Sequence, residues 1–104
     1  MHCPLAPSNI GKRRSATRPD RRRFYFTIAD EFHVEQSDKP GKLIYLQKLK
    51  FESDGRIELR LGYYIIGKKA AMRGRWVWGQ YATMMPVSDF RRIVNGAKRK
   101  GWLR

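Results

Sequence analysis

Residues 42–66, KLIYLQKLKFESDGRIELRLGYYII, decide the fold of this chain, because they hold two extended segments joined by a turn signal. The first segment, residues 42–52, is apolar on both faces at its start and then alternates with lysine, which predicts a central strand with one solvated end. The second alternates with period two and directs one apolar row to one side: Ile57, Leu59, Leu61, Tyr63 and Ile65. Between them, Asp54-Gly55 supplies the positive φ angles of a type I′ turn, so a hairpin is expected.

Extended segments are also expected on both sides of this hairpin. Residues 24–35 alternate apolar and polar side chains, which predicts a half-buried strand that bends near Asp30. Residues 75–82 form the fourth predicted strand. The period then changes to that of a helix, with an apolar stripe at Phe90, Ile93, Val94 and Ala97. Ser88 is the expected N-cap, and Gly101 suits the position after the last turn.

The resulting expectation is an α+β fold, in which a four-stranded antiparallel sheet precedes one C-terminal helix in a single domain over residues 24–104. The helix needs an apolar surface and should cover one face of the sheet. If the row that begins at Ile57 faces the helix, Arg56, Arg60 and Tyr64 lie on the open face. Parity alone leaves it open whether Trp76 and Trp78, or the residues between and beyond them, point to that open face.

Residues 1–23 have a different composition, with three prolines, few large apolar side chains and dense positive charge. Such a segment cannot bury enough surface to fold alone, so it is predicted to be a disordered basic arm. A mitochondrial transit peptide fits less well, because the segment lacks an amphipathic helical face. An arm that becomes ordered on nucleic acid is the favoured interpretation.

The formal net charge is +14 over 104 residues, with a sequence pI near 10.6. Both the arm and residues 24–104 are basic, which favours a polyanionic partner and places nucleic acid ahead of an anionic membrane. No apolar run approaches the roughly 20 residues that span a bilayer, and no secretory signal is evident. We therefore expect an intracellular protein, cytoplasmic or nucleoid-associated. His2, Cys3 and His33 have no metal-ligand spacing, so neither a metal nor a cofactor is expected.

Residues 67–81, GKKAAMRGRWVWGQY, combine a basic loop with an aromatic strand. Cations can neutralise phosphates, and an indole offers a face on which any base can stack. Trp at alternate strand positions is also common in cores and dimer interfaces, and this alternative stays open. The candidate nucleic-acid-binding residues come from the loop, the strands beside it and the arm: Arg56, Arg60, Tyr64, Lys68, Lys69, Arg73, Arg75, Trp76, Trp78, Arg21, Arg22 and Arg23. No catalytic residue is assigned.

The segments FYFTI, residues 24–28, and SDFRRIV, residues 88–94, look like the two ends of a PUR repeat. Over roughly residues 24–102 the order of elements resembles the PUR-alpha and whirly modules. That resemblance implies twisted antiparallel sheets with a helix, often paired as dimers, that bind single-stranded nucleic acid. It transfers no binding residue, because no diagnostic motif lies between the two ends.

The favoured hypothesis is thus a non-catalytic protein that binds single-stranded DNA or RNA, with a homodimer as a further expectation. Asp54 with residues 58–60 loosely matches the acidic pattern of metal-dependent nucleases, but Arg60 stands where lysine is expected. A small basic RNase toxin of the RelE kind is the enzymatic alternative, although those toxins begin with a helix. A ribosome-associated structural protein is the third, because such proteins join a compact basic domain to a basic arm.

Overall fold

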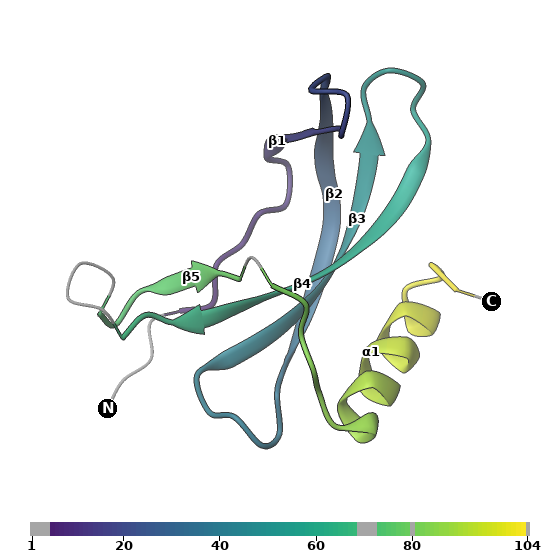
Figure 1. Cartoon of the computed structure of the whole chain (residues 1–104). Coiled ribbons are helices and arrows are strands. Elements are labelled where there is room, and N and C mark those ends of the chain that lie inside the picture. The colour runs from purple at the N-terminus through teal and green to yellow at the C-terminus, as the bar shows by residue number, and fades with distance from the viewer. Residues whose placement is uncertain (1–4, 69–72, 80, 104) are drawn as a thin grey trace.

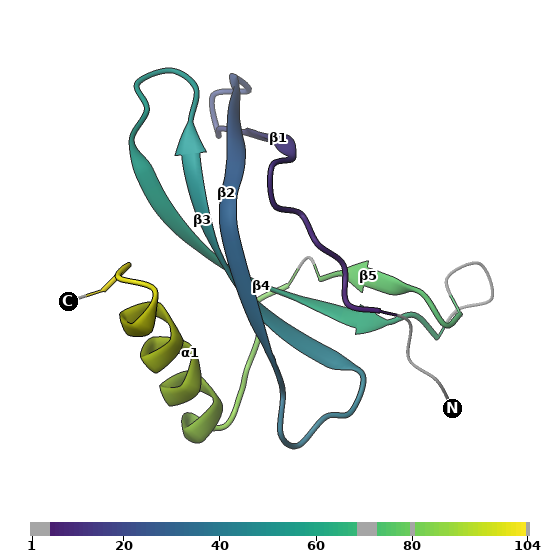
Figure 2. The same cartoon turned by 180° about the vertical axis from the view of Figure 1, so that it is seen from behind.

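The computed structural model describes residues 5–68, 73–79 and 81–103 and shows one curled antiparallel sheet with a helix on one side (Figure 1). Strands that follow one another in sequence are always neighbours in the sheet, in the order β1-β2-β3-β4-β5. Figure 2 shows from behind that α1 lies on the opposite side of the sheet from β1 and β5. The elements are β1 Arg13–Thr17, β2 Arg23–Glu35, β3 Lys42–Phe51, β4 Ile57–Ile66, β5 Trp76–Trp78 and α1 Val87–Arg99.

The prediction of four strands and a disordered arm is wrong, because β1 lies inside that arm and pairs with β2. Gly11 turns the chain with a φ of 84° just before β1. Ala16 then packs against the aromatic cluster at this end of the sheet, and Arg13 forms an ion pair with Glu52. The strand is thus stabilised by contacts with segments far along the chain, whereas its own polar sequence gives no strand signal.

Strand β2 changes the face to which its side chains point. The register with β3 shifts between Ile28 and Asp30, as expected for a β-bulge that inserts one extra residue. Before the shift, the even-numbered residues Phe26 and Ile28 lie on one face of the sheet. After the shift, the even-numbered residues Phe32 and Val34 lie on the opposite face. The apolar series of this strand was predicted to lie on one face, and the bulge makes that prediction wrong.

The bulge gives the sheet an apolar cluster on each face. On the face named here the inner face, Phe26, Ile28, Leu49 and Phe51 are buried together. On the opposite face, named the helix face, Ile44 and Leu46 pack against Ile93 and Ala97 of α1, with Phe32 and Trp102 at the margin. The core of this small chain is therefore divided between the two sides of a single sheet.

The apolar row of β4 lies on the helix face, on the side that the sequence analysis expected. It pairs with the even-numbered residues of β3, so Leu61 lies opposite Leu46. The helix nevertheless packs over β2 and the neighbouring part of β3, so the row stays partly open to solvent. Its exposed fractions are 49% for Ile57, 39% for Leu59, 42% for Leu61 and 40% for Ile65.

The length of β5 and the turn between β3 and β4 differ from those expected. Strand β5 is limited to Trp76–Trp78, shorter than the predicted residues 75–82. In the β3–β4 loop, Gly55 has a φ of 72° but Asp54 is not in the positive region, so the turn is not of type I′. The hydrogen bond from the Gly55 N–H to the Phe51 carbonyl, 2.9 Å, closes a longer loop instead.

The ends of α1 are held by different means from each other. At the start, Pro86 occupies the N-cap with no side-chain cap bond, so the expected cap at Ser88 is wrong. Asp89, only 1% exposed, instead accepts hydrogen bonds from the backbone N–H and the hydroxyl of Ser37, at 2.9 and 3.0 Å, and pairs with Arg92. At the end, Gly101 takes a φ of 77° as expected.

In the described part of the chain, no helix has the length and apolar character needed to cross a membrane.

Asp89 should make the stability of the fold depend on pH. The Arg92 guanidinium, together with the Ser37 N–H, holds the pKa of the Asp89 carboxyl below its usual value of 3.8. A depressed pKa stabilises the fold above the unfolded value, and this contribution is lost as pH falls through the folded value. Asp89→Asn should therefore lower the urea midpoint at neutral pH, and the difference from the parent should shrink below about pH 3.8. Ser88→Ala is the control and should match the parent throughout, and a difference that does not change with pH would contradict this role for Asp89.

Candidate nucleic-acid interface

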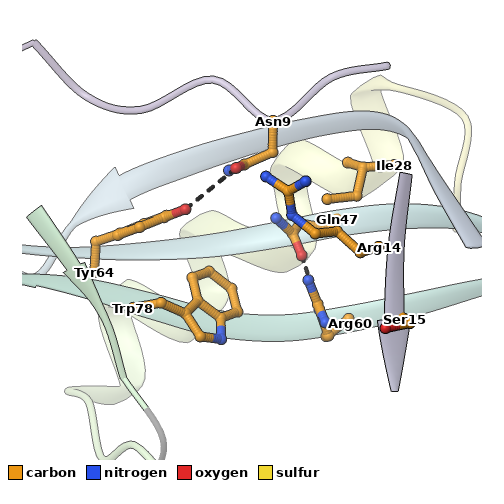
Figure 3. Close-up of a pocket in the computed structure, with 8 residues that line it drawn as sticks. All are labelled: Asn9, Arg14, Ser15, Ile28, Gln47, Arg60, Tyr64 and Trp78. Carbon is orange, nitrogen blue, oxygen red and sulfur yellow. Dashed lines mark hydrogen bonds between the residues drawn. The ribbon is translucent and has the colours of Figure 1, made fainter. Parts of the chain in front are cut away.

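The curl of the sheet encloses a hollow of about 360 Å³ on the inner face (Figure 3). Every strand contributes to its lining, as does the segment that precedes β1. In a flat sheet β1 and β4 would be three strand spacings apart, roughly 14 Å, and the curl brings both to one hollow. The lining residues are Asn9, Arg14, Ser15, Ile28, Gln47, Arg60, Tyr64 and Trp78.

Arg60 extends from β4 into this hollow between two aromatic rings. Its guanidinium carbon lies 5.1 Å from the ring centre of Phe26 and 5.1 Å from that of Trp78, and its Nε donates to Gln47 Oε1 at 2.9 Å. Burial, the largest effect, lowers the pKa of Arg60, and the nearby positive charge of Arg14 also lowers it, whereas Tyr64 and Glu31 act in the opposite direction. Within the described residues no carboxylate forms an ion pair with Arg60, so its charge is only partly compensated.

Arg14 reaches the same hollow from the opposite side. It lies on β1 across from Phe26, which places it on the inner face, and Figure 3 shows its side chain directed toward Gln47. Its guanidinium donates to the carbonyl oxygen of Arg13 at 3.1 Å, and it has no carboxylate partner in the part of the chain described. Two guanidinium groups from strands β1 and β4 thus share one hollow.

A buried carboxylate, Glu31, anchors the floor beside them. It is 8% exposed and accepts hydrogen bonds from the Asn9 backbone N–H at 2.8 Å and from Gln47 Nε2 at 2.9 Å. The Tyr64 hydroxyl completes the network, since it donates to Asn9 Oδ1 at 3.3 Å. Burying a carboxylate is costly unless donors surround it, so this network fixes the segment around Asn9 against the sheet.

The aromatic wall of the hollow includes Trp78 and Tyr64, whose rings meet edge to face with centroids 4.9 Å apart. The register answers the question that parity left open: Trp78 pairs with Tyr64 and Trp76 with Ile66, so both indoles lie on the inner face. The ring of Trp78 also lies over Gly62. A Cβ built there would come within 2.2 Å of the ring carbons, so only glycine allows this position.

The other predicted cations, one just before β4 and the rest in the segment after it, are not among the described residues that line the hollow. Arg56 stacks on Phe51 and forms ion pairs with Asp54 and Glu58, so its charge is compensated locally. Lys68, Arg73 and Arg75 are exposed in the segment that joins β4 to β5. Lys69 was also predicted to bind and falls outside the described residues.

Among the predicted cations of the arm, Arg21 and Arg22 lie in the turn between β1 and β2, and Arg23 begins β2. This turn borders a second hollow of about 400 Å³, lined by Arg18, Arg22, Arg23, Phe24, Tyr25, Glu52 and Ser53. Arg21 has a φ of 69°, an uncommon conformation for a residue with a side chain. Asp20 lies near Arg22 at 3.7 Å and partly offsets its charge.

The structure therefore brings Arg60, Tyr64 and Trp78 together, and it adds residues that the sequence analysis missed. Arg14 was overlooked because residues 1–23 were treated as disordered. Asn9 and Gln47 carry no motif, and their role appears only when the curl joins distant segments. A sequence signal for this site is Gln47, a polar residue directly after the apolar run at positions 43–46 of β3.

No three His, Cys, Asp or Glu side chains among residues 5–68, 73–79 and 81–103 lie together in a way that could hold a metal ion. Comparisons of the chain with protein families, with curated proteins and with solved structures found no match. Inference about function therefore depends on the chemistry of the hollow and of the surface around it.

Gly62→Ala should disrupt the aromatic wall. The added methyl would overlap the ring of Trp78, and overpacking of this kind costs about 1–3 kcal/mol of unfolding free energy. A urea melt would measure the loss, and a change in Trp emission would report the displaced ring. In the double variant with Trp78→Phe, the smaller ring lacks the atoms that clash, so the two changes together should cost less than their sum. An unchanged midpoint for Gly62→Ala would show that the ring is placed elsewhere.

Proposed function

We propose that this protein binds single-stranded nucleic acid, without catalysing a reaction, through the inner face of its sheet and the basic segments at its ends. The observation that carries the proposal is the pair of guanidinium groups, from Arg14 and Arg60, that share a hollow with aromatic rings and have no carboxylate in an ion pair among the described residues. Phosphate attracts such groups, and unstacked bases favour such rings.

The charge around the hollow supports a polyanionic ligand. The guanidinium carbon of Arg18 lies 5.4 Å from the ring centre of Phe24, and that of Arg60 lies 5.1 Å from the ring centre of Phe26. Both guanidinium groups thus pack beside aromatic rings. A guanidinium that is already restrained loses less conformational freedom when it binds a phosphate. Exposed cations at Lys68 and Arg73 on one side, and at the β1–β2 turn on the other, extend the positive surface beyond the hollow.

The size of the hollow supports a single strand over a duplex. About 360 Å³ is at the lower end of the roughly 300–1,000 Å³ of small-molecule pockets, so it admits one small group and not a double helix. In a duplex the bases are stacked inside and cannot reach Trp78 or Tyr64. A single strand can present a phosphate and a base to the same hollow.

The enzymatic and structural alternatives stay predictions. A small RNase toxin would cleave RNA, whereas the proposed binding protein leaves it intact. A ribosome-associated protein should bind short free strands poorly, whereas this module should bind them alone. The homodimer is also still a prediction, which sedimentation equilibrium would test, and the exposed apolar row of β4 is the surface to examine first.

Removing two exposed cations near β5 should weaken binding in a salt-dependent way. Fluorescence anisotropy with labelled strands of about 12 nucleotides, in DNA and RNA form, would give affinity at several salt concentrations. For the double variant Lys68→Ala and Arg73→Ala, the slope of log K against log salt should fall by roughly 0.7 for each phosphate that the variant no longer neutralises. The decrease in affinity should be similar for all sequences, because phosphate contacts carry no base identity.

The matched control is Lys98→Ala with Arg99→Ala, which removes the same charge from exposed positions on α1, away from the inner face. It should leave the slope close to that of the parent. Equal effects of the two double variants would indicate non-specific attraction, and a parent that binds no single strand at low salt, or binds duplex more tightly, would refute the proposal.

A further inference from the structure

The groups that line the hollow define the chemistry of what it can hold. Its amide oxygens are already in use, because Gln47 Oε1 accepts from Arg60 and Asn9 Oδ1 accepts from Tyr64. The hydrogen-bonding capacity that is left on Arg14 and Arg60 consists of N–H donors. A ligand must therefore bring acceptors, and a charged acceptor is favoured over a neutral one.

The charge balance of the hollow points to an anion. Glu31 is close, but Asn9 and Gln47 hold its carboxylate with N–H donors, and it makes no ion pair with either arginine within the described residues. Two guanidinium groups thus face one carboxylate that is already hydrogen-bonded. Like charges on two sides of a hollow repel each other, and an anion between them would turn this repulsion into attraction.

The arrangement of the rings adds a second requirement. Arg60 lies beside the Trp78 ring, and Tyr64 meets that ring on its edge, so any group bound at the guanidinium pair is close to an aromatic surface. A phosphate that carries a sugar and a base satisfies both requirements at once. A simple inorganic anion satisfies only the first.

We propose that this hollow binds one phosphate group of a nucleotide between Arg14 and Arg60, with the attached nucleoside against Trp78. This inference rests on the proposed function and assigns one position of the bound strand to one place on the protein. The phosphate can come from a diester within a strand, or from a monoester at a strand end or on a free nucleotide.

Arg14→Gln tests the inference, and Arg13→Gln is its matched control. The two residues are neighbours on β1 and undergo the same change of charge, but Arg13 points to the opposite face, where it lies over the Tyr25 ring at 3.9 Å and pairs with Glu52. Binding would be measured with a strand bearing a 5′-hydroxyl, the same strand bearing a 5′-phosphate, and adenosine monophosphate against adenosine. Loss of one charged hydrogen-bonding group in the hollow should weaken binding about tenfold or more, whereas Arg13→Gln should change it far less.

These ligands identify the source of the phosphate. Equal loss with the 5′-hydroxyl and the 5′-phosphate strand indicates an internal diester, because both strands contain it. Loss confined to the 5′-phosphate strand or to the monophosphate indicates a monoester, and each of these results supports the inference. The signal of the Trp78 indole N–H in an NMR spectrum should shift with the monophosphate more than with inorganic phosphate.

Stability separates a binding role from a structural one. Arg14→Gln removes repulsion from Arg60, so its thermal midpoint should equal or exceed that of the parent while its affinity falls. Arg60→Lys gives a second test, because lysine keeps the charge but lacks the planar fork of donors, and binding should again weaken. The inference is overturned, and the proposed function stands, if the parent binds strands but Arg14→Gln and Arg13→Gln lower the affinity equally. If the parent binds no strand, both are overturned.

Discussion

The register shift in β2 is the constraint on which the rest of the structure depends. A single extra residue between Ile28 and Asp30 sends the first half of the strand's apolar side chains to the inner face and the second half to the helix face. The first half supports the aromatic cluster under Arg60, and the second supports α1. Without the shift, all the apolar side chains of β2 would lie on one face of the sheet. The strand could then not contribute to an apolar cluster on each face. The bulge also contributes to the curl of the sheet, because bulges increase the local twist.

The hollow combines groups that stabilise the fold with groups whose charge the fold disfavours. The network around Glu31 satisfies a buried charge and fastens the chain at Asn9 to the sheet. The adjacent guanidinium groups do the reverse, since burial and mutual repulsion both disfavour the charge of Arg60. Groups whose charge is disfavoured by their surroundings cluster at functional sites, which supports the role proposed for the hollow. The hydrogen bonds to Gln47 and to the Arg13 carbonyl hold the guanidinium groups of Arg60 and Arg14 in position.

Much of the fold could be predicted from local sequence, because the long strands and the helix have strong periodicity. Strands β2, β3 and β4 and helix α1 were placed within a few residues of their observed bounds, and the side on which the apolar row of β4 lies was predicted correctly. Strand β1 could not be found, since its partners lie in β2 and its own pattern is polar. The bulge was hidden too, because parity looks continuous through Ile28 and Phe32. In the site, Arg60, Tyr64 and Trp78 were named in advance, whereas Arg14 and Asn9 depend on contacts across the curl.

The strict neighbour order of the strands has a consequence for how the chain reaches this structure. Every ladder joins segments that are consecutive in sequence, so each hairpin closes a short loop and costs little entropy of closure. The sheet can therefore grow by adding one strand at a time. On the inner face, the hydrogen bond from Tyr64 to Asn9 spans 55 positions. Lys100, at the C-cap of α1, bonds Asp30 across 70 positions, so the docking of α1 is the most distant of these closures. We expect the helix face to be sealed last, which leaves the apolar side chains of β2 and β3 that α1 covers exposed for the longest part of folding.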